Sequence, residues 1–130
     1  MIDLSDALYE QAGRPQPTEI RLKKDAKKLV VAFENSHKFE FPAELLRVES
    51  PSAEVQGHNP SQKQLVAGRR HVGIMNMEPV GNYAVRLNFD DLHNTGLFSW
   101  SYLYAMGLHQ DALWDAYIDN LAQAGLSRDP

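Results

Sequence analysis

Apolar and polar residues alternate along the first part of the chain. Within each short run between residues 19 and 41, every second position is apolar: Ile20, Leu22, Leu29, Val31, Phe33, Phe39 and Phe41. This period predicts half-buried antiparallel strands, because successive side chains of a strand point to opposite faces of a sheet. Asp25-Ala26-Lys27 and Asn35-Ser36 are suited to the turns between these strands.

A second alternating region lies between residues 72 and 90. Its clearest run is Tyr83, Val85, Leu87 and Phe89. The preceding Pro79-Val80-Gly81-Asn82 has the composition of a turn and predicts a hairpin. We therefore expect residues 19–41 and 72–90 to be mainly strand.

The last third of the chain changes to a period near 3.6, which predicts helices over residues 98–106 and 111–124. Gly107 is expected to end the first helix, Asp111 to cap the second, and Gly125 to end it. One face of the second helix is apolar and is expected to pack onto the sheet: Leu113, Trp114, Tyr117, Ile118 and Leu121. The expected fold class is α+β, a mostly antiparallel sheet with C-terminal helices packed on one face.

The segment between the two strand regions favours loops. Pro42 predicts a break, followed by a short helical turn over residues 43–46. Four Pro and Gly residues then fall within eighteen positions: Pro51, Gly57, Pro60 and Gly68. A long loop in a small domain is usually functional or disordered. Residues 1–17 and 126–130 are also expected to be loosely ordered, within a single domain over residues 1–130.

Composition narrows the function classes. The chain has 130 residues, 43% hydrophobic and 23% charged, which is the balance of an ordinary globular protein. It has no cysteine, which excludes disulfides and thiolate metal ligands. No apolar run approaches the ~20 residues that cross a bilayer, and no signal peptide is recognisable. We expect a cytoplasmic protein that does not enter a membrane.

The charge is unevenly distributed. The net charge of −4 argues against nucleic-acid binding, yet no Asp or Glu occurs between Glu54 and Glu78. That interval contains a set of basic and titratable residues: His58, Lys63, Arg69, Arg70 and His71. It predicts either a local patch that attracts anions or simply a solvated loop beside an acidic helix.

Five segments together resemble one known family. They are residues 41–47 (FPAELLR), 46–55 (LRVESPSAEV), 81–84 (GNYA), 89–93 (FDDLH) and 95–103 (TGLFSWSYL). They resemble the gamma-butyrobetaine hydroxylase-like N-terminal domain family, which includes small stand-alone bacterial proteins once called a domain of unknown function. Members also precede an oxygenase domain in carnitine biosynthesis and follow an iron-sulfur ATPase in plants. Leu92 departs from the pattern, because many relatives have Gly there.

The resemblance implies a metal site that this chain has largely lost. In the family, three cysteines and a later histidine hold a structural zinc. The corresponding residues here are Ser50, Ser52, Val55 and His93. A Ser hydroxyl keeps its proton near neutral pH and Val cannot ligate, so only an oxygen–nitrogen set such as His93, Asp91 and His58 would hold zinc or iron. The competing expectation is a metal-free turn with His93 hydrogen-bonded and no cofactor.

Enzyme motifs are largely absent. His109-Gln110-Asp111 has the HxD spacing of an iron oxygenase, but no histidine follows it to complete the triad. The nucleophile elbow, the phosphate loop and the dinucleotide-binding fingerprint are missing from the sequence. We therefore expect a protein that is not an enzyme.

Two functional hypotheses remain. The first is a non-catalytic binding module that recognises a protein partner or an anionic ligand through five residues: Arg47, His58, Lys63, Arg69 and Arg70. The second is a metal-binding accessory role, linked to the handling of iron or iron-sulfur proteins. The resemblance itself implies that residues 47–58 lie against the turn at 90–96, which would bring His93 near Ser50 and Ser52.

Overall fold

The computed structural model describes residues 2–130 and contains two three-stranded antiparallel sheets with helices beside them. The strands are β1 (Pro17–Lys23), β2 (Lys28–Phe33) and β3 (Lys38–Pro42) in one sheet, and β4 (Ile74–Val80), β5 (Ala84–Phe89) and β6 (Leu97–Ser99) in the other. The helices are α1 (Ala7–Gln11), α2 (Ala43–Val48), α3 (Ala53–Gln56), the 3-10 turn η1 (Pro60–Gln62), α4 (Trp100–Leu108) and α5 (Gln110–Gln123). The α+β class is confirmed, with two sheets in place of one.

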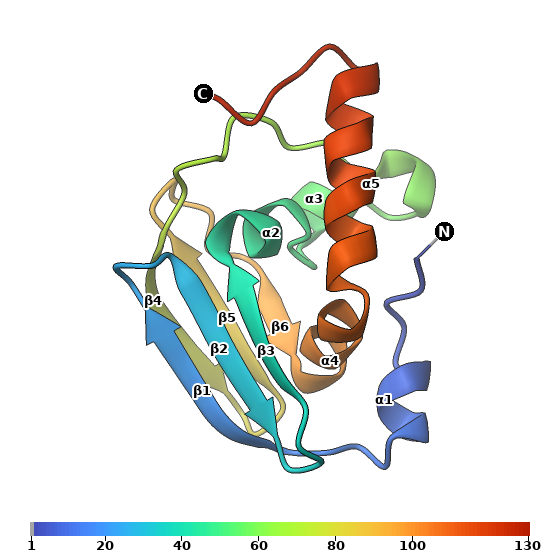
Figure 1. The fold of residues 1–130 in the computed structure, drawn as a ribbon, viewed down its shortest axis with the longest axis vertical. Coiled ribbons are helices and arrows are strands. Elements are labelled where there is room, and N and C mark those ends of the chain that lie inside the picture. The colour runs from blue at the N-terminus through green and yellow to red at the C-terminus, as the bar shows by residue number, and fades with distance from the viewer. Residues whose placement is uncertain (1) are drawn as a thin grey trace.

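The main hydrophobic core joins the inner faces of both sheets to α2 and α4. Leu29, Val31 and Phe33 of β2 contribute one side of it, and the alternating residues of β5 contribute another. Figure 1 shows the first sheet in front of the second, with α5 along the side beyond β3. The predicted strand period is therefore confirmed, except that Tyr83 precedes β5 and is exposed.

Three predictions about the helix boundaries are wrong. The helix expected to begin at residue 98 begins at Trp100, because Phe98 lies in β6. Gly107 lies inside α4, which continues to Leu108, and a methyl group on Gly107 would overlap the ring of Phe39. Glycine is thus placed here by close packing and not by a helix end. Asp111 lies in the first turn of α5, whose N-cap is His109. Gly125 follows the end of α5 with φ +67°, as expected for the residue after a helix.

The apolar face of α5 packs mainly against α2 and a loop, and the prediction that it packs onto the sheet is wrong for most of its residues. Tyr117 and Leu121 pack with Val48 of α2 and with the loop residues 65–67, away from the sheet. Ile118 is 38% exposed, because the buried stripe runs along positions 113, 117 and 121 and Ile118 lies next to it. Only Leu113 belongs to the main core, with Trp114 packed between the two clusters.

Single residues of both terminal segments contact the rest of the domain. Tyr9 of α1 is buried, packs edge-on against Tyr104 and donates a hydrogen bond to the Pro15 carbonyl at 2.8 Å. Near the other end, the Arg128 guanidinium binds both carboxylate oxygens of buried Glu44. Among residues 2–130, no helix is both long and apolar enough to span a membrane.

Candidate functional site

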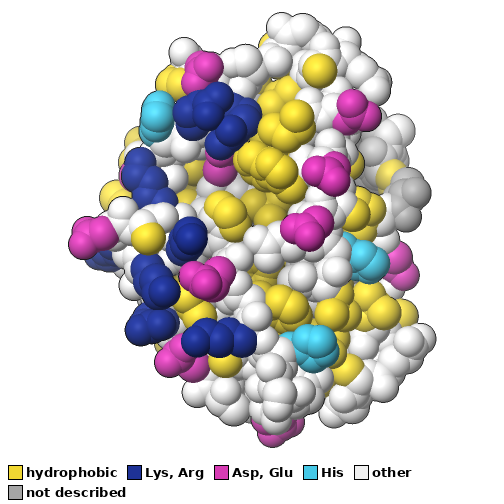
Figure 2. Space-filling model, in the orientation of Figure 1, with side chains coloured by type: hydrophobic (Ala, Val, Ile, Leu, Met, Phe, Trp, Pro, Cys, Tyr) yellow, Lys and Arg dark blue, Asp and Glu magenta, His cyan; other side chains and the backbone are white. Residues whose placement is uncertain are grey.

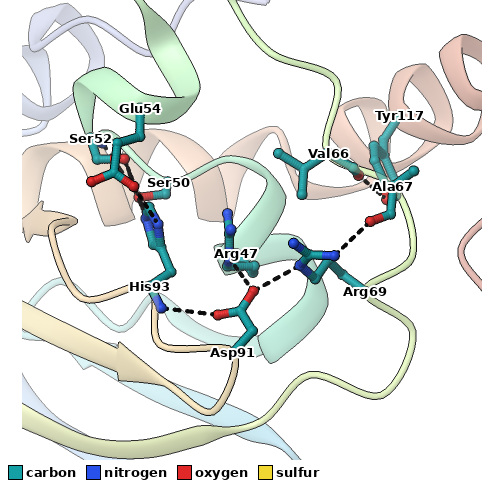
Figure 3. A network of polar contacts seen from close by, with 10 residues as sticks. All are labelled: Arg47, Ser50, Ser52, Glu54, Val66, Ala67, Arg69, Asp91, His93 and Tyr117. Atoms are coloured by element: carbon teal, nitrogen blue, oxygen red, sulfur yellow. Dashed lines mark hydrogen bonds and ion pairs between the residues drawn. The ribbon is translucent and has the colours of Figure 1, made fainter. Parts of the chain in front are cut away.

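The loop after α2 lies directly against the turn after β5, as the sequence predicted. Nε2 of His93 is 3.0 Å from the Ser50 hydroxyl oxygen and 3.3 Å from that of Ser52 (Figure 3). The two hydroxyls are 3.2 Å apart. Ser52 occupies the N-cap of α3 but makes no capping hydrogen bond, so its hydroxyl is free to contact His93. The residues at the positions that the resemblance assigned to a metal site thus form a cluster of hydrogen bonds.

The other ring nitrogen of His93 fixes its tautomer. Nδ1 lies 3.3 Å from the Glu54 carboxylate, which also accepts a hydrogen bond from Thr95 at 2.8 Å. Because an ionised carboxylate can only accept, we place the proton on Nδ1 and leave Nε2 to accept from a serine hydroxyl. Burial, aided by the positive charge of Arg47, lowers the pKa of His93. The imidazole is therefore neutral near neutral pH.

Asp91 joins this turn to two arginines. One carboxylate oxygen accepts a hydrogen bond from the backbone N–H of His93 at 3.2 Å, which closes the turn. The other oxygen accepts from Nε of Arg47 and Nε of Arg69, each at 2.7 Å. Burial alone would raise the pKa of Asp91, but the bonds from Arg47, the His93 amide and Arg69 outweigh it and the pKa is lowered.

The backbone conformation at Leu92 explains why glycine would suit this position. Leu92 has φ +73°, a left-handed conformation that glycine adopts without strain and leucine does not. Its side chain is 81% exposed, so no packing interaction selects leucine here. The turn keeps its shape because the Asp91 carboxylate and the Phe89–His93 backbone hydrogen bond hold both sides of it.

The arrangement of Ser50, His93 and Glu54 has the connectivity of a nucleophile–base–acid relay. However, Ser50 is 0% exposed and His93 is 5% exposed. A Cβ atom on Gly96 would lie only 2.5 Å from the Ser50 hydroxyl, so the backbone of the turn closes over it. No substrate can reach the hydroxyl without opening this packing, and the cluster acts as a clamp between loop and turn.

The donor atoms do not match a metal site. The Asp91 carboxylate is directed to Arg47 and Arg69, and His58 is an exposed residue of the loop after α3. Val55, at the third cysteine position, is buried and offers no ligand atom. Throughout residues 2–130, no three His, Asp or Glu side chains come together in a group that could hold an ion. The remaining donors are one imidazole, which zinc binds well, and two hydroxyls, which it binds poorly, so the four good ligands of a structural zinc site are not present together among residues 2–130.

The predicted partner-binding residues are mostly engaged within the protein. Arg47, expected on the outside, is 8% exposed, because Asp91 draws its guanidinium inward. Arg69 shares the same carboxylate. Lys63 pairs with the buried Glu49 at 2.7 Å and Arg70 with Asp129 at 2.5 Å. The loop therefore does not present a cluster of free cations. The sequence-based expectation missed this, because counting charges along the chain does not reveal carboxylates that come from distant segments.

A groove that sequence analysis missed lies beside the clamp. It has a volume of about 1080 Å³ and is lined by α5, by the loop from Gln56 to Val66, and by Ile2 and Leu4 near the N-terminus. We call it the α5 groove. Lys63 and His58, two of the predicted residues, lie on its wall. The apolar run at residues 65–67, opposite the apolar stripe of α5, was the available signal.

Comparison with known proteins agrees with the sequence resemblance. The sequence pattern of the family described as gamma-butyrobetaine hydroxylase-like, N-terminal, matches residues 20–104. The chain belongs to this family. No curated protein matched it.

Solved structures of similar chains support the fold of this family member. Two NMR solution structures share 48% and 45% identity with it, at TM-scores of 0.77 and 0.78. The first alignment covers 89% of this chain and 91% of the other, and the second covers 92% and 89%. A crystal structure of a protein of unknown function from Acidithiobacillus ferrooxidans, assigned to the DUF971 family, is 41% identical over 68% of this chain and 88% of its own, at a TM-score of 0.57.

Proposed function

We propose that this member of the gamma-butyrobetaine hydroxylase-like N-terminal family is a non-catalytic interaction module that binds an apolar segment of a partner protein in the α5 groove. The observation that carries the proposal is the groove itself, at about 1080 Å³. Sites for small ligands usually have volumes of about 300–1,000 Å³, so this groove has room for several side chains of a peptide.

The chain itself indicates which chemistry fits the groove. Ile2 and Leu4 come from a segment before α1 that is neither helix nor strand. They line the groove and pack against the main core while remaining partly buried. Aliphatic side chains from a segment outside the helices and strands are therefore already accommodated at this surface. A partner segment with similar side chains would continue the same packing and bury more apolar area.

Charge disfavours a small anion as the ligand. Lys63 on the groove wall is paired with Glu49, and Arg69 and Arg70 are paired with Asp91 and Asp129. An anion would have to displace a carboxylate from each cation, which removes most of its advantage. This favours the protein partner over the anionic ligand, the two alternatives that the sequence left open.

Hydrogen bonds from tyrosines of α4 and α5 hold the loop wall of the groove in place. Tyr102 donates to the Glu49 carbonyl at 2.5 Å, and Tyr117 donates to the Val66 carbonyl at 2.7 Å. The clamp around His93 fixes the start of the same loop. A preformed surface pays less conformational entropy on binding, and the hydrogen bonds thus replace the family's zinc as the support.

The test is selection of peptides from a displayed library on the purified protein, followed by affinity measurements on a matched pair of variants. Ala116 and Ala122 are both exposed alanines of α5, but only Ala116 lines the groove. Selected peptides should carry aliphatic pairs, and Ala116→Arg should weaken their binding at least about tenfold by filling the groove with a charge. Ala122→Arg should leave binding unchanged. Equal effects of the two substitutions, or peptides without aliphatic residues, would reject the groove as the site.

The metal-linked accessory role has weaker support. It requires His93 to turn from Ser50 and Ser52 towards a metal, and Asp91 to leave two arginines. Elemental analysis of untagged protein is its test: one zinc or iron per chain would favour this role over the interaction module.

A further inference from the structure

Three exposed cations without an acidic partner lie on one side of the first sheet. Of the thirteen Lys and Arg residues in the chain, eight form ion pairs, and Lys27 donates to the His71 carbonyl. Apart from Lys27, four cations within residues 2–130 have no carboxylate within ion-pair distance: Arg21, Lys24, Lys28 and Lys38. All four are exposed and belong to β1, β2, β3 or the turn that joins β1 to β2.

The strand register places three of these four on the same side of the sheet. Leu29 and Val31 of β2 face the core, so Lys28, Val30 and Ala32 face outward. Val30 lies opposite Arg21 of β1 and Glu40 of β3, and Ala32 lies opposite Glu19 and Lys38. Lys28 lies opposite Lys23 and Pro42. We call these nine positions the outer sheet face.

None of the helices within residues 2–130 lies over the outer sheet face (Figure 1). Val30 is 0% exposed but is absent from the core cluster, so we attribute its burial to the long side chains around it. Figure 2 shows Lys and Arg side chains gathered over this part of the molecule, with a few acidic side chains between them. A net charge of −4 for the whole chain therefore conceals a positive face.

We propose that the outer sheet face is a second interaction surface, which binds an acidic segment of a partner protein. Four cations, at Arg21, Lys23, Lys28 and Lys38, share this face with the carboxylates of Glu19 and Glu40. Alternate residues of a strand are about 6.6 Å apart and neighbouring strands about 4.8 Å apart. Acidic side chains at every second residue of an extended segment match these spacings.

The same face is a poor match for nucleic acid. Phosphates repeat one negative charge without interruption, so Glu19 and Glu40 would repel any strand laid across the cations. The nine positions also include no aromatic residue on which a base can stack. A protein segment avoids both problems, because it can vary its charges from residue to residue.

The proposal is tested by titrating the full chain, labelled with ¹⁵N, with a synthetic peptide that alternates Glu and Ser over about twelve residues. Amide signals of β1, β2 and β3 should shift, and the affinity should fall as salt is raised. The double variant Arg21→Ser/Lys38→Ser should bind at least about fivefold more weakly. The matched control is Arg14→Ser/Arg86→Ser, which removes two exposed cations that have acidic partners elsewhere. It should bind like the original chain.

Three results would overturn the proposal: equal binding by the two double variants, signal shifts confined to the loop at residues 58–70, or tighter binding of a single-stranded oligonucleotide of the same charge. This test can fail or succeed independently of the test of the α5 groove. Ala116→Arg should leave binding of the acidic peptide intact, and Arg21→Ser/Lys38→Ser should leave binding of aliphatic peptides intact.

Discussion

Asp91 is the residue whose loss should most clearly reveal how the site is held together. Its carboxylate accepts from Arg47 and Arg69 at 2.7 Å each and closes the turn before His93. Arg47 is 8% exposed, and its Nη1 atom is buried with no hydrogen-bond partner. Replacing Asp91 with Ala would leave this guanidinium buried without its counter-charge, which typically costs about 3–5 kcal/mol.

Three comparison variants separate the contributions of charge and geometry. Asp91→Asn keeps an acceptor oxygen and the turn but loses the charge, so we expect a cost of about 2 kcal/mol. Arg69→Ala removes the more exposed partner and leaves the Arg47–Asp91 pair, for a cost of about 1 kcal/mol or less. Arg47→Met combined with Asp91→Ala should be more stable than Asp91→Ala alone, because no unpaired charge remains.

The assay is urea unfolding, monitored by the fluorescence of Trp100 and Trp114. Variants can be compared only if the slope of the unfolding free energy against urea concentration is the same as in the original chain. The lowered pKa of Asp91 adds a pH dependence. The unfolded chain binds this proton more readily than the folded one, so the stabilisation is complete well above the unfolded pKa and is lost as pH falls through the folded pKa. The gap between the original chain and Asp91→Asn should narrow from about pH 6 to about pH 3. An Asp91→Ala variant within about 1 kcal/mol of the original would refute the argument.

Three further predictions concern the clamp and the packing of the helices. Because the pKa of His93 is lowered in the folded state, the unfolded state binds a proton on this residue at a higher pH than the folded state does. The free energy of unfolding should therefore fall as pH drops from about 8 to about 5. His93→Gln should flatten this pH dependence, measured by urea unfolding at each pH. Thermal unfolding should have the same midpoint with and without a strong chelator, because Ser50 and Ser52 hold the loop to His93 by hydrogen bonds. A fall in the midpoint that zinc reverses would contradict this prediction. Trp114→Ala should cost about 2 kcal/mol, since Trp114 is only partly buried beneath Arg128, whereas Leu103→Ala in the core should cost about 3–5 kcal/mol in the same assay.

Local sequence patterns predicted the elements well, because strand and helix periods are properties of neighbouring residues. The alternation at Val85, Leu87 and Phe89 appears as β5, with all three side chains buried. The resemblance predicted the contact between His93 and the two serines, because the spacing of residues survived the loss of the cysteines. The local pattern gave the wrong role for Gly107. Glycine is needed there because the ring of Phe39, sixty-eight positions away in the sequence, packs against it.

The sequence by itself determined the fold class, the strands β1 to β5, the helices α2, α4 and α5, and the absence of thiolate ligands, since each follows from residue identity or from short-range period. It did not predict β6, α1 or α3. Only the tertiary structure decided which charges are free. Asp91, Glu49 and Asp129 each reach a cation from a distant segment, so the basic loop at residues 58–70 is largely neutralised while the outer sheet face is not. The α5 groove likewise exists only where two apolar segments from different parts of the chain meet. Pairing and burial are relations between distant residues, and folding alone brings those residues together.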